Sequence, residues 1–231
     1  MRFVSLRKSA DVAPLSYESV RQYQLTLVEA RARDEIENTI LFLEHEPVIT
    51  RGRGLQFTGT RRDRHMPLPV VLPAEVAFAE SERGGDLTYH GPGQLVIYPI
   101  IKLDGSNAFA PKHDVAGFLR GLESTVIRVL DSYSLSGGSR AHAAGVWVGD
   151  RKIASIGIAI RKWVTYHGIA VNCVNDLKPF FLMSPCGFAP DVMTRLQDCL
   201  PKYDLKSWRE DFERRFIFEL GHSTQAESRL L

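Results

Sequence analysis

The sequence has few cysteines and no group of residues spaced like metal ligands. Its three cysteines, Cys173, Cys186 and Cys199, are not in close pairs and form no Cys-x-x-Cys motif. A small, odd number of separated cysteines argues against a disulfide framework and favours free thiols in a reducing compartment. The seven histidines follow no metal-ligand spacing either, so we expect no bound metal.

The sequence also lacks a strong charge and a long apolar segment. Its 231 residues include 29 Lys and Arg and 27 Asp and Glu, which gives a formal net charge of +2. This balance does not favour nucleic acid or an acidic membrane as a partner. No stretch approaches the roughly 20 apolar residues of a membrane span, and the first residues contain no signal-peptide core. We therefore expect a cytoplasmic protein with no membrane partner.

Three segments have the apolar periodicity of amphipathic helices. The first spans Ser16–Arg31, with Ser16 suited to the N-cap. Its expected inward face consists of Val20, Tyr23, Leu27 and Ala30. The second spans Asp114–Leu130, and the third begins at the capping-box sequence Ser207-x-x-Glu210 and ends at Gly221.

Four segments predict β structure. Apolar runs at Thr39–Leu43 and Leu95–Ile101 are typical of strands, and Pro99 favours an edge position or a bulge for the second. Gly145–Ala154 predicts a hairpin around a Gly-Asp turn, and Trp163–Asn172 predicts a further strand. Because the strands cluster between helices, we expect an α+β fold with a mixed, largely antiparallel sheet flanked by helices. No repeat or linker divides residues 1–231, so we expect a single domain.

A glycine-rich segment carries the clearest functional signal. It reads Arg83-Gly-Gly-Asp-Leu-Thr-Tyr-His-Gly-Pro-Gly-Gln94, with glycines on both sides of a polar patch. Glycine lets a backbone approach a ligand closely, so this composition indicates a shaped ligand wall. The alternative is a glycine-rich turn that precedes a strand.

Two further residues are candidates for chemistry. Cys186 lies in Ser-Pro-Cys-Gly, a turn that could expose a nucleophilic thiol, although a free cysteine can equally be a small buried hydrophobe. Lys152 begins the second arm of the predicted hairpin, before small and apolar residues; there it is either a partly desolvated base or an exposed hairpin lysine. We interpret Cys173, in a predicted strand, as a core residue and Cys199 as structural.

A group of arginines in one part of the chain has two interpretations. It is a solvated loop or a docking surface for an acidic partner protein. Its members are Arg51, Arg53, Arg61, Arg62 and Arg64.

Four segments together resemble motifs of the lipoate-pathway octanoyltransferases, which belong to the superfamily of biotin and lipoate protein ligases. They are Arg83–Gln94, Lys152-Ile-Ala-Ser-Ile-Gly157, Thr165-Tyr-His-Gly-Ile-Ala-Val-Asn172 and Ser184-Pro-Cys-Gly187, in the order of the family. The resemblance implies a catalytic domain built on a mixed sheet with helices packed on it. It also implies that Lys152 and Cys186 form a catalytic pair.

The resemblance further implies a reaction and its partners. An octanoyl group would pass from octanoyl-acyl carrier protein to a lysine of an apo lipoyl domain, through a thioester on the cysteine. The acceptors would be the lipoyl domains of 2-oxoacid dehydrogenase complexes and the H protein of the glycine cleavage system. No cofactor is implied. Because no interface stripe is evident, we expect a monomer.

The same resemblance assigns a pocket for the acyl chain. Its residues would be Arg83, Gly84, Gly85, Asp86, Leu87, Thr88, Tyr89, His90, Ser155, Ile156, Gly157, Gly168, Ile169 and Ala170. His167 would have at most a supporting role, and a satisfied interior histidine is an equal alternative. Each buried methylene contributes about 0.8 kcal/mol, so burial alone can hold an eight-carbon chain.

Two other functions remain open. An ATP-dependent lipoate or octanoate ligase of the same superfamily would need a phosphate site, but the sequence has no P-loop motif, and Arg51-Gly-Arg-Gly54 is only faintly similar to the basic loop of biotin ligases. A non-catalytic protein that binds carriers would have little use for Lys152 and a thiol on a turn.

Overall fold

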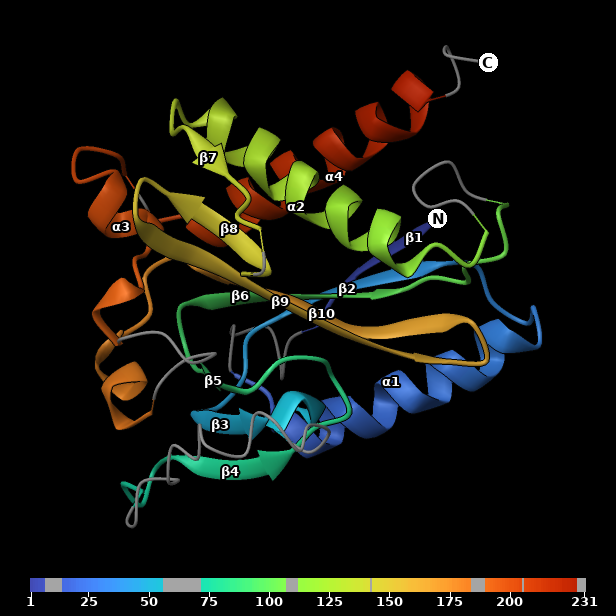
Figure 1. Ribbon diagram of the computed structural model, residues 1–231, viewed down its shortest axis with the longest axis horizontal. Coiled ribbons are helices and arrows are strands. Elements are labelled where there is room, and N and C mark those ends of the chain that lie inside the picture. Colours follow the sequence, from blue (N-terminus) through green and yellow to red (C-terminus); the bar gives the residue numbers. More distant parts are fainter. Residues whose placement is uncertain are drawn as a thin grey trace.

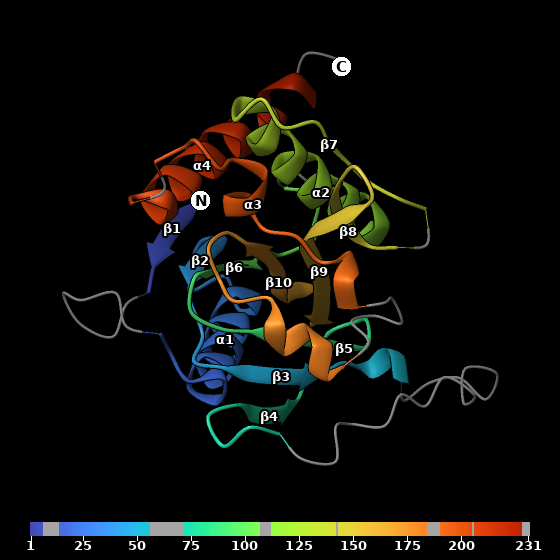
Figure 2. The same cartoon turned by 90° about the vertical axis from the view of Figure 1, so that its left-hand side faces the viewer.

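The computed structural model describes residues 1–6, 14–55, 72–106, 112–141, 143–183, 190–204 and 206–227. A seven-stranded sheet forms the middle layer (Figure 1). Helices α2 (Val115–Ser132) and α4 (Trp208–Glu227) cover one face, and α1 (Tyr17–Ala32) and a three-stranded sheet lie on the other (Figure 2). The α+β prediction is therefore confirmed.

The large sheet is mixed and mostly antiparallel. Among its described strands, β1 and β2 pair in parallel and every other pair is antiparallel. The strand order is β1 (Arg2–Ser5), β2 (Thr39–Leu43), β6 (Gln94–Ile100), β10 (Val164–Asn172), β9 (Arg151–Arg161), β8 (Gly145–Val148) and β7 (Gly137–Gly138).

The small sheet and a few short helices complete the described fold. The small sheet has the order β4 (Ala77–Glu80), β3 (Val48–Arg51) and β5 (Leu87–His90). The short helices are η1 (Arg53–Leu55), η3 (Lys178–Leu182), η5 (Pro190–Val192) and α3 (Leu196–Cys199).

The core has a layer on each face of the large sheet. Successive side chains of a strand point to opposite faces, so Ile40 and Phe42 of β2 pack toward α2 and α4, whereas Leu41 and Leu43 pack toward α1. All five residues of β2 are buried. A continuous apolar run of this kind is stable only in a strand that is covered on both sides.

The three predicted helices are present, with corrections. In α1, Val20 and Leu27 are buried as expected, but Tyr23 is 38% exposed, and the polar Gln24 takes its place inside. Ser16 is at the N-cap position without a side-chain hydrogen bond to the helix. In α4, the prediction of a C-terminal cap at Gly221 is wrong. A cap glycine ends a helix by adopting the left-handed conformation, with a positive φ. Gly221 does not have a positive φ, and the helix continues through it.

Of the two alternatives for Pro99, the edge position is wrong, because β6 lies between β2 and β10. On the β10 side, however, the ladder runs only as far as Ile169 opposite Ile97 and resumes as a bridge between Val164 and Lys102. In the gap, Thr165 Oγ1 donates to the carbonyl of Pro99 at 2.6 Å. A side-chain hydroxyl thus satisfies the carbonyl of Pro99 where the backbone ladder is interrupted.

A buried ion network joins α4 to the end of β2. Arg209 donates to Glu44 at 3.0 Å and to Glu213 at 2.9 Å, and its side chain is only 4% exposed. Glu44 also accepts the N–H of Gly93 at 2.6 Å. The network ties α4 to the glycine-rich segment that carries the candidate site.

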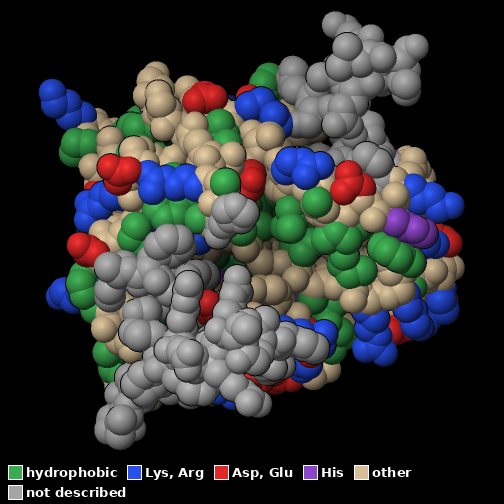
Figure 3. All heavy atoms as spheres, in the orientation of Figure 1, with side chains coloured by type: hydrophobic (Ala, Val, Ile, Leu, Met, Phe, Trp, Pro, Cys, Tyr) green, Lys and Arg blue, Asp and Glu red, His purple; other side chains and the backbone are tan. Residues whose placement is uncertain are grey.

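The charged surface agrees with the balanced composition. On the face shown in Figure 3, Lys and Arg side chains lie next to Asp and Glu side chains. Among the described helices, none combines the length and the apolar character that are needed to cross a membrane.

Candidate functional site

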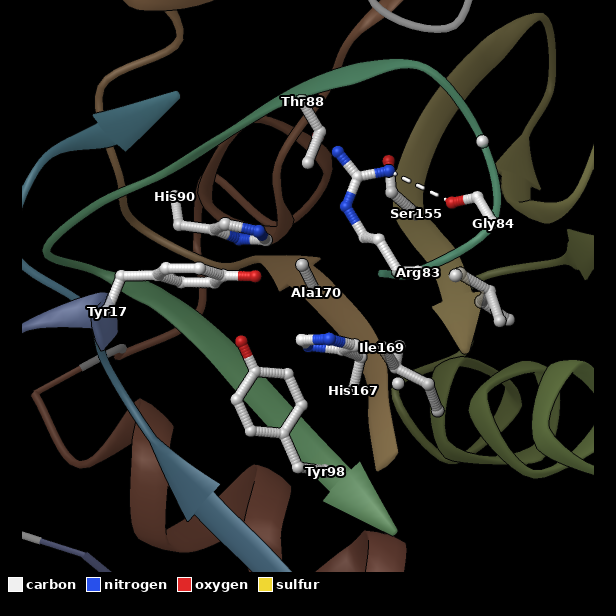
Figure 4. Close-up of a pocket in the computed structure, with 14 residues that line it drawn as sticks. Tyr17, Arg83, Gly84, Thr88, His90, Tyr98, Ser155, His167, Ile169 and Ala170 are labelled. Atoms are coloured by element: carbon white, nitrogen blue, oxygen red, sulfur yellow. Dashed lines mark hydrogen bonds between the residues drawn. The ribbon is translucent and has the colours of Figure 1, made fainter. Parts of the chain in front are cut away.

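A cavity lies where the large sheet, the small sheet and the start of α1 meet (Figure 4). It brings together eleven of the fourteen residues predicted for the acyl pocket: Arg83, Gly84, Gly85, Thr88, His90, Ser155, Ile156, Gly157, Gly168, Ile169 and Ala170. These residues come from three segments that are far apart in the sequence. The cavity also includes Tyr17, Tyr98 and His167, which the pocket prediction left out.

Three predicted pocket residues lie elsewhere. Leu87 and Tyr89 belong to a separate apolar cluster with Phe180 because alternate residues of β5 face opposite ways, whereas Thr88 and His90 line the cavity. Asp86 is in the turn before β5, where its carbonyl accepts the N–H of Gly52 at 3.0 Å. These three residues support the cavity wall but do not line the cavity.

The loop at Arg83–Asp86 is fixed by close backbone contacts. Arg53 N–H donates to the carbonyl of Arg83 at 2.9 Å, and Gly54 N–H donates to that of Gly85 at 3.0 Å. A Cβ on Gly52 would lie 2.3 Å from the oxygen of Gly85, so only glycine permits this approach. The Arg51–Gly54 segment therefore supports the cavity wall through these backbone contacts.

The other side of the same loop contacts β9. Gly84 N–H donates to the carbonyl of Ile158 at 2.9 Å, and a Cβ on Gly157 would lie 2.8 Å from the oxygen of Gly84. The buried Arg83 guanidinium donates to Thr50 O at 2.8 Å and to Asp86 O at 2.7 Å. The glycines and this arginine thus give the wall its shape.

His90, which lines the cavity, and His45, which lies behind Tyr98, are both buried and held in the neutral form. His45 Nδ1 lies 3.1 Å from the carbonyl of Leu15, which can only accept, so Nδ1 carries the proton and Nε2 accepts from Tyr98 Oη at 2.8 Å. Burial lowers the pKa of His45 to about 4. His90 Nδ1 lies 2.8 Å from Gln94 Oε1, and burial lowers the pKa of His90 well below its usual value. The His90 ring therefore adds a neutral, not a cationic, group to the cavity wall.

His167 is bound to a charged pair at the edge of the cavity. Its Nε2 lies 3.3 Å from Glu82 Oε2, and Arg21 Nε donates to the same oxygen at 3.1 Å. The hydrogen bonds from His167 and Arg21 hold the pKa of Glu82 well below its usual range. Burial lowers the pKa of His167 despite this carboxylate, so the neutral imidazole donates from Nε2.

Lys152 is buried, so the alternative of an exposed hairpin lysine is wrong. Its Nζ lies 5.7 Å from the centre of the Trp147 ring, within range of a cation–π contact. A Cβ on Gly145 would lie 2.6 Å from Lys152 Cε, so the lysine side chain crosses directly over that glycine. Lys152 does not line the cavity itself but lies on the same strand as Ser155, three residues away.

The cysteines separate into different environments. Cys173 is fully buried in the main core, where burial raises its pKa, and its interpretation as a core residue is confirmed. Cys199 is partly buried, with its sulfur 3.7 Å from Thr194 Oγ1. Cys186 lies outside the described residues. Beyond it in the chain, Thr194 N–H donates to the carbonyl of Lys152 at 3.0 Å.

The predicted arginine group is only partly described. Arg51 pairs with Glu80 of the neighbouring strand, and its guanidinium lies 5.7 Å from the ring centre of Phe78. Arg53 is exposed on η1. Arg61, Arg62 and Arg64 lie outside the described residues, so the docking interpretation stays a prediction.

Comparison with known proteins agrees with this architecture. The family model "Lipoyl protein ligase A/B catalytic domain" matches residues 16–217. A probable octanoyltransferase of Pyrobaculum arsenaticum is 39% identical over 201 residues, which cover 85% of this chain and 80% of that protein. An octanoyltransferase of Syntrophobacter fumaroxidans is 40% identical over 203 residues, with 85% and 83% covered.

Solved structures share the fold at low sequence identity. A putative lipoate protein ligase from T. acidophilum with bound lipoic acid has a TM-score of 0.63 at 14% identity, over 96% of this chain and 85% of that chain. A lipoate-protein ligase A bound with ATP has a TM-score of 0.61 at 14% identity, over 100% and 93%. The chain belongs to the lipoyl protein ligase A/B catalytic-domain family, and within it to the octanoyltransferases.

Proposed function

We propose that this protein transfers an octanoyl group from octanoyl-acyl carrier protein to a lysine of apo lipoyl domains, through a thioester on Cys186. Lys152 is the proposed proton carrier, and the cavity between the two sheets is the proposed acyl site. The acceptors are the lipoyl domains of 2-oxoacid dehydrogenase complexes and the H protein of the glycine cleavage system.

The observation that carries this proposal is the position of Lys152. The lysine is buried, lies against Trp147 and is on the strand whose next residues line the cavity. Lysine side chains are rarely buried in proteins, and burial is a common property of lysines that transfer protons. The cavity beside it is lined by glycines, Ile156, Ile169 and neutral rings, which suit an alkyl chain.

The proposed reaction has two steps that share one proton carrier. The Cys186 thiolate, stabilised by the Lys152 ammonium, attacks the octanoyl carbonyl carbon, and the carrier thiolate leaves and takes a proton from Lys152. The acceptor amine then attacks the enzyme thioester and gives a proton to Lys152. A C–N bond forms, the C–S bond breaks, and the Cys186 thiolate returns. A thioester already stores the energy that amide formation needs, so the scheme requires no ATP.

The structure offers less support for an ATP-dependent ligase. The backbone N–H groups of Gly52, Arg53 and Gly54 all donate to carbonyls of the Arg83–Asp86 loop. In this arrangement they are not available to cradle a phosphate, which is what a basic glycine loop would have to do.

The test is intact-mass analysis after incubation with octanoyl-acyl carrier protein in the absence of ATP. We expect one octanoyl adduct on the wild type, labile to hydroxylamine, and none on Cys186→Ala. Cys199→Ala is the matched control and should form the adduct normally. An adduct that persists in Cys186→Ala would reject the assigned nucleophile. A wild type that forms no adduct but octanoylates an added apo lipoyl domain with ATP and free octanoate would favour the ligase.

A further inference from the structure

His167 has a backbone conformation that is unusual within a strand. It lies inside β10, yet its φ is +55°. Residues with a Cβ rarely adopt this left-handed conformation, and such residues gather at functional sites. On the β9 side His167 pairs with Ile158, but on the β6 side the ladder is interrupted from Pro99 onward. The interruption frees β10 from a regular geometry at this one residue.

Contacts from α1 and from Glu82, the residue before the glycine-rich segment, hold His167 in place. Its backbone N–H donates to Gln24 Oε1 at 2.7 Å, and its ring is fixed through Nε2 by Glu82. Gln24 is a fully buried polar residue of α1, which a helix gains nothing by burying unless it bonds a specific partner. A buried amide thus fixes the backbone of His167, and a partly exposed carboxylate fixes its ring.

The imidazole closes one end of the cavity. Its ring is parallel to that of Tyr17, with an interplanar angle of 3° and ring centres 6.3 Å apart, and perpendicular to that of Tyr98 at 6.0 Å. In Figure 4 these rings and that of His90 gather on one side of the view, and Ser155 lies on the other. The cavity therefore has one end lined by aromatic and imidazole rings, and Ser155 lies away from that end.

The pairing of β9 with β10 gives the cavity a direction. Ser155 pairs with Ala170, Gly157 with Gly168 and Ile158 with His167, so the pairs move steadily away from Lys152. From Ser155 to Ile158 is three residues, or about 10 Å at the rise of a strand. An extended eight-carbon chain, with bonds of about 1.5 Å, spans about 9 Å. A chain whose carbonyl lies at the level of Ser155 would end against His167.

We infer that His167 is the floor of the acyl site and sets the upper limit of acyl-chain length. This inference rests on the proposed function, because it takes Lys152 as the reacting end of the cavity. A ninth or tenth carbon would have to displace the imidazole and break its bond to Glu82, while the backbone bond to Gln24 keeps the residue as a whole from moving away. His167 is on this view a specificity-determining residue and takes no part in the proton transfers.

The test compares chain-length preference in two variants of the floor. His167→Gly removes the ring and relieves the left-handed backbone; His167→Asn shortens the side chain with a residue that tolerates positive φ. The matched control is His113→Gly, because His113 has a φ of +59° but is exposed and stacks on Trp163. The measurement is kcat/KM for adduct formation from octanoyl- and decanoyl-acyl carrier protein, by intact mass.

We expect the decanoyl-to-octanoyl ratio of kcat/KM to rise about 15-fold in His167→Gly, because each newly buried methylene contributes about 4-fold. The ratio should rise less in His167→Asn and stay unchanged in His113→Gly. A circular dichroism melt identifies the folded variants, and the asparagine variant decides if the glycine variant does not fold. If the wild type forms the adduct but the folded His167 variant shows an unchanged decanoyl-to-octanoyl ratio, the assignment of His167 as the floor is refuted and the proposed function is not. A wild type that forms no adduct overturns the proposed function and the floor together.

Discussion

Gly145 offers a direct test of how the hairpin positions Lys152. Its φ is +131°, and a Cβ there would lie 2.3 Å from the carbonyl oxygen of Ala154, 2.6 Å from Lys152 Cε and 3.3 Å from Nζ. Gly145→Ala therefore adds backbone strain of about 1–3 kcal/mol and an overpacking cost of about 1–3 kcal/mol. Relief must come from β9 or from the lysine, and both movements shift Lys152.

We expect Gly145→Ala to lower the free energy of unfolding by about 4 kcal/mol, the middle of the summed range of those two costs. We also expect it to slow octanoyl transfer about 100-fold, the usual effect of misplacing a catalytic group by about 1 Å. Urea unfolding gives the first quantity. Adduct formation with octanoyl-acyl carrier protein, at a temperature where the variant is folded, gives the second.

Gly149 in the same hairpin supplies the control. Its φ is +55°, and a Cβ there would meet nothing within 4 Å. Gly149→Ala should cost only about 1–2 kcal/mol of stability, from the left-handed backbone, and should leave transfer close to the wild-type rate. The reasoning would be refuted if Gly145→Ala transferred octanoyl at the wild-type rate, or if Gly149→Ala lost as much activity.

Three further predictions concern pH, the buried ion network and the cavity wall. Because the pKa of His45 falls from 6.5 to about 4 on folding, the unfolded chain binds the proton first. Stability should therefore drop by about 3 kcal/mol between pH 6.5 and pH 4, and a His45→Gln variant should show a flatter urea-unfolding profile over that range. Arg209→Met should cost about 3–5 kcal/mol in thermal unfolding, because it strips a buried carboxylate of its partner. Arg214 is exposed, so Arg214→Met should cost less than about 1 kcal/mol. Equal losses of stability in the two arginine variants would contradict the importance given to the buried network. Gly52→Ala should cost about 1–3 kcal/mol and reduce adduct formation, whereas Gly138→Ala, whose Cβ would meet nothing within 4 Å, should do neither.

Much of the architecture is local in origin and was therefore predictable. The apolar run Thr39–Leu43 and the hairpin over Gly145–Ala154 follow from residue periods and turn chemistry. The glycines of Arg83–Gln94 predict a wall that a ligand can approach closely, whereas the contacts of this loop in the structure are to the backbone of Gly52, Gly54 and Ile158. The choice of pocket residues, however, came from family resemblance, because no local pattern says which segments meet.

Some predictions failed where a distant contact overrode a local preference. Tyr23 was assigned inward by its spacing, but Gln24 lies inside because the N–H of His167, 143 residues later, needs an acceptor. Pro99 would suit an edge strand, yet it lies inside the sheet, where Thr165 Oγ1 donates to its carbonyl. Gln24 and Thr165 are both distant in the sequence from the residue they bond, so local sequence does not reveal either contact.

By itself, the sequence determined the three long helices, the strands β2, β6, β8, β9 and β10, the α+β class and the segments rich in glycine, since each of these depends on residues within a few positions of one another. The strands β1, β3, β4, β5 and β7 were not predicted from it. Only the tertiary structure decided that Tyr17, Tyr98 and His167 enclose one end of the cavity and that Lys152 is buried against Trp147. These features come from α1, β6, β8, β9 and β10 together. The physical reason is that burial and hydrogen-bond partners are properties of the packed chain, which sequence spacing alone does not specify.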